Sequence, residues 1–192
     1  MLASASPRRR QLLASAGVRF EVKPSNLPEH ARLGETPAQL ARRLASEKAG
    51  AVARSLGPSP ARWVLGADTL VVIDGEVLGK PDDEAHALVL LRRLVGRCHR
   101  VVTGVALVAS DTLEERHAVV ESFVSMRAAG ESELRAYVAT GESLDKAGAY
   151  AAQGNGRRLI EKIEGSETNV IGLPLEETLA LLRAAGIRFG AP

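Results

Sequence analysis

The most continuous run of apolar positions covers residues 63–81, WVLGADTLVVIDGEVLGKP, and carries one carboxylate, Asp68, ahead of a turn. A run of this length rich in β-branched residues predicts a buried strand. Side chains alternate along a strand, so Gly66 and Asp68 share one face, while Ala67 and Thr69 share the other. A buried carboxylate is costly unless it is neutral, paired or bound to a cation, and Asp68 is therefore the first candidate for chemistry.

The turn after this strand is predicted from Asp74-Gly75, a two-residue hairpin signal. Residues 76–79 then run back beside the strand and return Lys80 toward the region of Asp68. An acid and a base are thus expected near one pocket.

Two further stretches begin with a hydroxyl residue followed by proline, a pattern typical of helix starts. They predict helices at 7–16 and 37–56, which end at Gly17 and Gly57. Lys48 falls in the apolar stripe of the second helix. A lysine there either extends its ammonium outward to solvent or points it into an interior cleft.

The remaining periodicity predicts a mixture of strands and helices. Strands are expected at 18–22, 99–110, 114–127 and near 159–163, and helices at 81–96, 131–140 and 174–186. This mixture, with its hairpins, predicts an α/β fold in which a mixed sheet is flanked by helices and two lobes enclose a central cleft. We expect residues 1–192 to form a single domain.

Composition adds limits on function. The chain is 45% apolar but only 3% aromatic, and 25 Lys and Arg against 23 Asp and Glu leave a net charge of +2. That balance is too weak to indicate nucleic-acid or membrane binding. No apolar run approaches the roughly 20 residues of a membrane span. Cys98 is the single cysteine, which excludes an intrachain disulfide and fits a reducing compartment, so we expect a cytoplasmic protein.

Three arginines, Arg8 to Arg10, lie in the first turn of the first predicted helix, where the helix dipole is already positive. The arrangement is unfavourable unless an anion lies among them, and Ser4 adds a hydroxyl nearby. The alternative is a solvated basic turn. Glu29 lies alone in a loop, a position more often solvated than ligating.

Residues 141–156, GESLDKAGAYAAQGNG, form a second dense polar segment. Its small residues permit close approach of a ligand, and Gln153 offers both a donor and an acceptor to a base edge. The alternative is a tight surface loop with an Asp145-Lys146 ion pair. Cations, carboxylates and an amide together suit a polyphosphate with Mg²⁺ or Mn²⁺. No Walker-type motif is present, so the chain is not a P-loop NTPase.

An ordered series of motifs resembles the Maf family of nucleotide pyrophosphatases over nearly the whole chain. The series is SASPRRRQLL from Ser4, SEKA around Lys48, GADT at Asp68, GKP at Lys80, HRVVTG, LDKAGAYAAQG and GLPL. The resemblance implies a Maf-like fold of the inosine-triphosphatase type, usually dimeric, and metal-dependent hydrolysis of a nucleoside triphosphate to monophosphate and pyrophosphate.

The same resemblance implies roles for individual residues. Asp68 would accept the proton of the attacking water and, with Glu29, hold Mg²⁺ or Mn²⁺. The expected substrate-binding residues are Ser4, Arg9, Lys48 and Lys80. Just before Glu29 many members carry a second acid where this chain has Pro28, which leaves Asp68 a larger share of the task. The apolar lead before Ser4 is also shorter than usual in the family, which leaves two interpretations, a shortened first strand or a misplaced start.

Three positions separate the subgroups. Arg8, Thr69 and Gln153 resemble the residues found at these positions in the subgroup that acts on dTTP and UTP. The 7-methyl-GTP subgroup has Trp, Gln and Glu at the same positions. A Trp would stack on a cationic methylated purine and a Glu would pair with its charge. We therefore expect a pyrimidine triphosphate as substrate. The resemblance to the family implies a homodimer, and the composition leads us to expect no membrane partner. The alternatives are a 7-methyl-GTP pyrophosphatase and a non-catalytic nucleotide- or nucleic-acid-binding protein that inhibits septum formation, although so few aromatics make nucleic acid an unfavoured partner.

Overall fold

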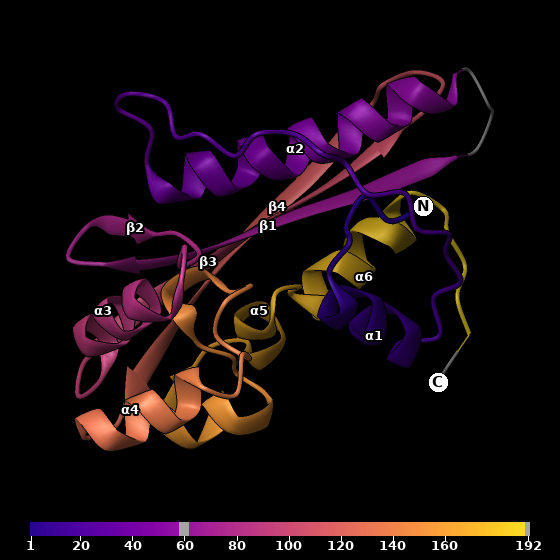
Figure 1. The fold of residues 1–192 in the computed structure, drawn as a ribbon. Coiled ribbons are helices and arrows are strands. Elements are labelled where there is room, and N and C mark those ends of the chain that lie inside the picture. The colour runs from indigo at the N-terminus through magenta and orange to yellow at the C-terminus, as the bar shows by residue number, and fades with distance from the viewer. Residues whose placement is uncertain (58–61, 191–192) are drawn as a thin grey trace. The chain divides into compact units, whose positions relative to one another are not determined.

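The computed structural model describes residues 1–57 and 62–190, and its helices and strands are interspersed along the chain (Figure 1). In order, the elements are α1 (Pro7–Ser15), α2 (Pro37–Leu56), β1 (Trp63–Ile73), β2 (Glu76–Leu78), α3 (Glu84–Leu94), β3 (Cys98–Ala109), β4 (Glu115–Met126), α4 (Glu131–Val138), the 3₁₀ turns η1 (Ala147–Ala149) and η2 (Gly154–Leu159), β5 (Ile160–Glu164), α5 (Glu167–Ile171) and α6 (Leu175–Ala184).

The five strands form one sheet in the order β2-β1-β3-β4-β5. β1 pairs with β2, and β4 with β5, in antiparallel register. Near the N-terminus, Leu2 adds parallel bridges to Val22 and Leu65. This arrangement of an α/β sheet flanked by helices confirms the predicted fold class.

The chain divides into two compact units. The first unit contains Met1–Thr69, Thr103–Val120 and Gly172–Pro192, and the second contains Leu70–Val102 and Glu121–Ile171. The long strands β1, β3 and β4 therefore contribute residues to both units. The expectation of a central cleft and that of a single domain stay predictions.

In the first unit, side-chain alternation along β1 and β3 creates two cores. Residues such as Val64 and Ala106 pack with Ala45 and Val52 of α2 on one face. On the other face, alternate residues of the same strands pack with α1 and α6 in a cluster that includes Leu13, Leu65, Ala67, Val105, Leu107 and Leu182. The predicted division of β1 into two faces is confirmed.

Two glycines let α2 lie directly on the sheet. A Cβ added to Gly66 would lie 2.3 Å from the carbonyl oxygen of Ala45, and a Cβ added to Gly104 would lie 2.3 Å from that of Ala41. Both distances are far inside van der Waals contact. The close approach brings Lys48 of α2 near Asp68 of β1.

Helix starts follow their capping residues. The Thr36 hydroxyl accepts the backbone N–H of Gln39 at 3.3 Å, and the Gln39 side chain accepts the N–H of Thr36 at 2.9 Å, a reciprocal capping box ahead of Pro37. The second unit has the predicted hairpin, with φ of 53° at Asp74 and 80° at Gly75.

Two sequence predictions were wrong. The strand expected at 18–22 is only an isolated bridge between Leu2 and Val22. At this bridge the backbone N–H of Leu2 donates to the carbonyl oxygen of Glu21, and the carbonyl oxygen of Leu2 accepts from the N–H of Lys23. The helix expected from residue 81 begins at Glu84, because the Asp83 carboxylate caps it by accepting the N–H of His86 at 2.7 Å.

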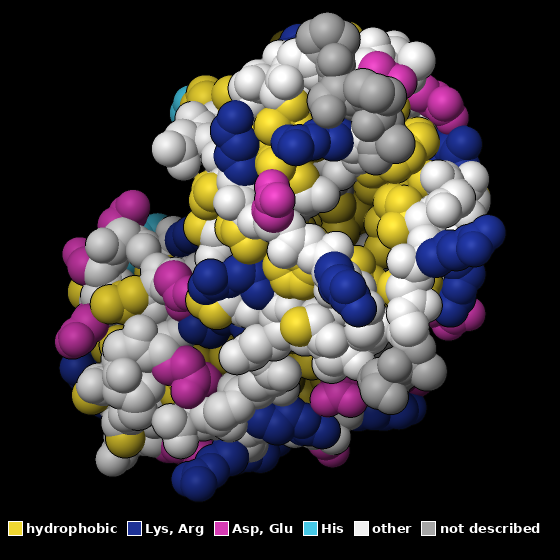
Figure 2. Space-filling model, turned by 90° about the vertical axis from the view of Figure 1, so that its right-hand side faces the viewer, with side chains coloured by type: hydrophobic (Ala, Val, Ile, Leu, Met, Phe, Trp, Pro, Cys, Tyr) yellow, Lys and Arg dark blue, Asp and Glu magenta, His cyan; other side chains and the backbone are white. Residues whose placement is uncertain are grey.

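None of the helices in the described part of the chain has the length and apolar character needed to span a bilayer. On the face drawn in Figure 2, Lys and Arg side chains are scattered among Asp and Glu.

Candidate functional site

Arg9 is held in place by three hydrogen bonds from its guanidinium. Its Nε donates to the carbonyl oxygen of Gly172 at 2.8 Å, Nη1 to Ser4 Oγ at 3.1 Å, and Nη2 to Thr69 Oγ1 at 3.1 Å. A guanidinium carries five N–H donors in a fixed fork, so these bonds fix its orientation and leave two donors for a ligand. The expected substrate-binding residues Ser4 and Arg9 and the expected specificity residue Thr69 are thus in hydrogen-bond contact within the first unit, while their roles stay predictions.

The electrostatic environment of Arg9 combines burial with nearby acids. Burial lowers the pKa of the Arg9 guanidinium, and the Asp68 and Glu29 carboxylates oppose that shift. Arginine remains protonated in proteins, so the result is a fixed positive charge partly removed from water. Such a group binds phosphate or carboxylate oxygens strongly.

Thr69 supports Arg9 from the strand. Its hydroxyl lies 3.0 Å from Thr103 Oγ1 and 3.3 Å from the carbonyl oxygen of Gly172, as well as accepting from Arg9. A hydroxyl has one hydrogen and two lone pairs, so these contacts occupy it. Its expected role in specificity stays a prediction.

Sequence reasoning missed two members of this cluster, Thr103 and Gly172. Thr103 is fully buried in β3, a polar side chain inside an apolar run. That is the same signal that singled out Asp68. Gly172 contributes a backbone carbonyl, which side-chain patterns do not reveal.

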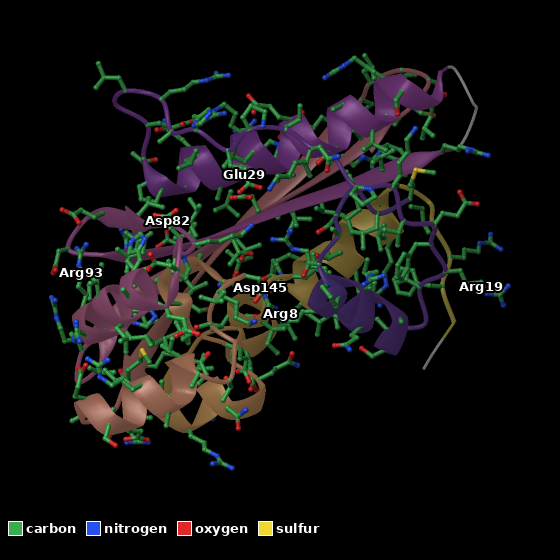
Figure 3. All side chains as sticks on the ribbon, in the orientation of Figure 1. Arg8, Arg19, Glu29, Asp82, Arg93 and Asp145 are labelled. Atoms are coloured by element: carbon green, nitrogen blue, oxygen red, sulfur yellow. The ribbon has the colours of Figure 1, made fainter. Side chains whose placement is uncertain are left out.

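On the opposite face of β1, Lys48 joins two carboxylates. Lys48 is only 7% exposed, and its ammonium donates to Asp68 Oδ1 at 2.5 Å and to Glu29 Oε1. The alternative in which this lysine extends to solvent is excluded. Figure 3 shows Glu29 beneath α2, on the side where that helix faces β1.

Asp68 is 5% exposed and lies on the face of β1 that packs against α2. Burial raises the pKa of Asp68, while the Lys48 and Arg9 cations act in the opposite direction. The net shift is upward, so this carboxylate holds a proton more readily than a solvated aspartate. A general base benefits from such a shift, because catalytic efficiency is greatest when its pKa approaches the working pH.

The expected Mg²⁺ or Mn²⁺ can be compared with the donors present. Among the described residues, no group of three or more His, Cys, Asp or Glu side chains is placed to hold a metal ion. Asp68 and Glu29 do converge, since both contact Lys48. Mg²⁺ commonly binds one or two carboxylates and completes its shell with water and substrate phosphates, so the two carboxylates fit such a metal.

The other predicted residues are distributed over both units. Arg8 lies half-buried in the first turn of α1 (Figure 3). Lys80, just after β2, and Gln153, just before η2, are exposed residues of the second unit. Their participation with Arg9 and Asp68 in one site stays a prediction.

Residues 1–185 match the sequence pattern of the family described as Maf-like protein. The chain belongs to the Maf family. The resemblance found in the ordered motifs is thereby confirmed.

Relatives within the Maf family match almost end to end. A protein of Geobacter sulfurreducens named dTTP/UTP pyrophosphatase is 49% identical over 186 residues, which cover 97% of this chain and 96% of the relative. Proteins of the same name from Myxococcus xanthus and Symbiobacterium thermophilum are 49% and 48% identical, with 97% of this chain and 92% and 93% of theirs covered.

Proposed function

We propose that this Maf family member is a pyrophosphatase that hydrolyses dTTP and UTP to the monophosphate and pyrophosphate. The observation that carries the proposal is the buried Lys48–Asp68 pair, joined by Glu29 and lying in the same unit as the anchored Arg9. Identities of 48–49% to relatives named dTTP/UTP pyrophosphatase support the substrate assignment.

In the proposed reaction, water attacks the α-phosphorus, the bond from that phosphorus to the bridging oxygen breaks, and pyrophosphate leaves. Asp68 accepts the proton of the water. Arg9 and Lys48 bind phosphate oxygens and stabilise the charge that develops on them, and Lys80 is proposed to do the same. This reaction needs no serine or cysteine nucleophile, because water attacks directly with the help of a base and of cations that stabilise the phosphate charge.

We also propose that Glu29 and Asp68 hold the Mg²⁺ or Mn²⁺ that accompanies the triphosphate. The metal would neutralise phosphate charge when bound. Lys48 contacts both carboxylates, and its positive charge reduces the repulsion between them.

For the base, we propose that Arg8, Thr69 and Gln153 favour a pyrimidine. The Gln153 amide is exposed and offers a donor and an acceptor to a uracil or thymine edge. The proposal includes a cytoplasmic homodimer. The single thiol Cys98, which is exposed and free, suits a reducing compartment.

A substrate panel tests the proposal. The protein is incubated with dTTP, UTP, CTP, GTP and 7-methyl-GTP, each with Mg²⁺ or Mn²⁺, and pyrophosphate is assayed. We expect release from dTTP and UTP. Release only from 7-methyl-GTP would assign the other subgroup, and no release from any triphosphate would favour a non-catalytic binding protein.

A further inference from the structure

The segment that carries Gln153 is held on both sides by residues in the last turn of α4 and just after that helix. Ahead of Gln153, the N–H of Ala151 donates to the Tyr137 hydroxyl at 3.2 Å. After it, the N–H groups of Asn155 and Gly156 each donate to the Glu142 carboxylate at 3.0 Å. Gln153 is therefore bracketed by two anchors only five residues apart in the sequence.

Glu142 is itself fixed by its neighbours. Its backbone N–H donates to Thr140 Oγ1 at 3.3 Å, and its carbonyl oxygen accepts from Lys146 Nζ at 2.5 Å. Its carboxylate lies half-buried against Gly154, where an added Cβ would be 2.8 Å from Glu142 Oε2. The positive φ of 65° at Gly154 likewise favours glycine, so the backbone is shaped to admit this carboxylate.

We infer that Glu142 is a positioning residue for Gln153 and thereby helps to set selectivity for the pyrimidine base. This inference rests on the proposed function, in which Gln153 contacts the base. Glu142 acts through backbone N–H groups and not on the substrate. Two hydrogen bonds to an ionised acceptor are stronger than neutral ones, which suits a residue that must hold an exposed loop in one conformation.

The test compares Glu142→Ala and Glu142→Gln with a matched control, Glu161→Gln, which changes the same charge at an exposed position of β5. Glu142→Gln keeps one carbonyl acceptor and serves if the alanine variant folds poorly. For each protein, kcat/KM is measured for dTTP, UTP and CTP, together with inhibition by pyrophosphate, which lacks a base. Amide exchange of Asn155 and Gly156 is measured in parallel by NMR.

We expect Glu142→Ala to lower the ratio of kcat/KM for dTTP over CTP by about tenfold, as loss of charge-assisted hydrogen bonds implies, with Glu142→Gln intermediate and the control unchanged. Inhibition by pyrophosphate should stay the same, while exchange at Asn155 and Gly156 accelerates. An unchanged ratio in an active Glu142→Ala protein, or unchanged exchange, would overturn the assignment of Glu142. A wild-type protein that hydrolyses neither dTTP nor UTP would instead contradict the proposed function, and the selectivity role with it.

Discussion

Lys48 pairs with one buried carboxylate, Asp68, and with one exposed carboxylate, Glu29. Alone, either Asp68 or Lys48 would be an expensive group to remove from water, because an unpaired charge in a protein interior costs several kcal/mol. Paired at 2.5 Å, with Glu29 on the same ammonium, Asp68 and Lys48 each offset part of the cost of burying the other. Removing any one of the three side chains changes the contacts of the other two. Substitutions that test their roles should therefore keep the size and shape of the original side chain.

Asp68→Asn preserves shape and removes the base. We expect kcat for dTTP to fall by a factor on the order of 10² to 10⁴, the usual contribution of a general base. Affinity for the non-hydrolysable α,β-imido-dUTP, measured by calorimetry without added metal, should change little, because metal binding through Asp68 then makes no contribution. Asp111→Asn, at an exposed turn, is the control. Full activity in Asp68→Asn would remove Asp68 from the role of base.

At the scale of elements, the site depends on how closely α2 approaches β1 and β3. Gly66 and Gly104 make this approach possible, since a methyl group at either would overlap the helix backbone. The packing of α2 against the sheet is therefore coupled to the placement of Lys48 beside Asp68.

Gly66→Ala should destabilise the protein by about 1–3 kcal/mol, because the new Cβ would lie 2.3 Å from Ala45 O and 2.8 Å from Ala49 N. Urea unfolding measures the change. Gly79→Ala is the matched control, since nothing lies within 4 Å of its added Cβ. Equal stability of the two variants would show that α2 can move away from β1 at little cost.

Local signals predicted most elements of the fold. Ser6-Pro7 and Thr36-Pro37 marked true helix starts, and Asp74-Gly75 marked the hairpin. The 18–22 strand failed because alternation of Val18, Phe20 and Val22 reports half-burial and not the presence of a partner strand. The sequence left two directions open for the Lys48 ammonium, toward solvent or into an interior cleft, because the direction depends on acids that lie in β1 and in the loop before α2. The role of Gly172 could not be predicted from the sequence, since the residue contributes only a backbone carbonyl.

For the whole molecule, the long strands suggest cooperative unfolding. Because β1, β3 and β4 supply residues to both units, loss of either unit removes support from the same strands. We expect one transition in urea, with fluorescence of the single tryptophan, Trp63, coinciding with far-UV circular dichroism. Two separated transitions would contradict a single-domain chain.

Stability should also fall in mild acid because of His99. This side chain is 3% exposed and its Nε2 lies 2.8 Å from the Tyr150 hydroxyl, and burial lowers its pKa from 6.5 to about 4. The unfolded chain therefore takes up the proton first. The contribution of neutral His99 to stability is complete above pH 6.5 and is lost as the pH falls toward 4, which lowers the free energy of unfolding by roughly 3 kcal/mol.

Urea unfolding at a series of pH values measures this loss. His99→Gln keeps a polar partner for Tyr150 but does not titrate, so its stability should vary less between pH 6.5 and 4. Parallel curves for the wild type and the variant would show that His99 does not cause the loss.

In the proposed reaction, Asp68 activates water for attack on the α-phosphorus of dTTP. Hydrolysis in H₂¹⁸O, with the products analysed by mass spectrometry, tests it directly. We expect one ¹⁸O atom in dTMP, none in pyrophosphate, and little product of either kind from Asp68→Asn. Label in pyrophosphate, or release of inorganic phosphate in place of pyrophosphate, would contradict it.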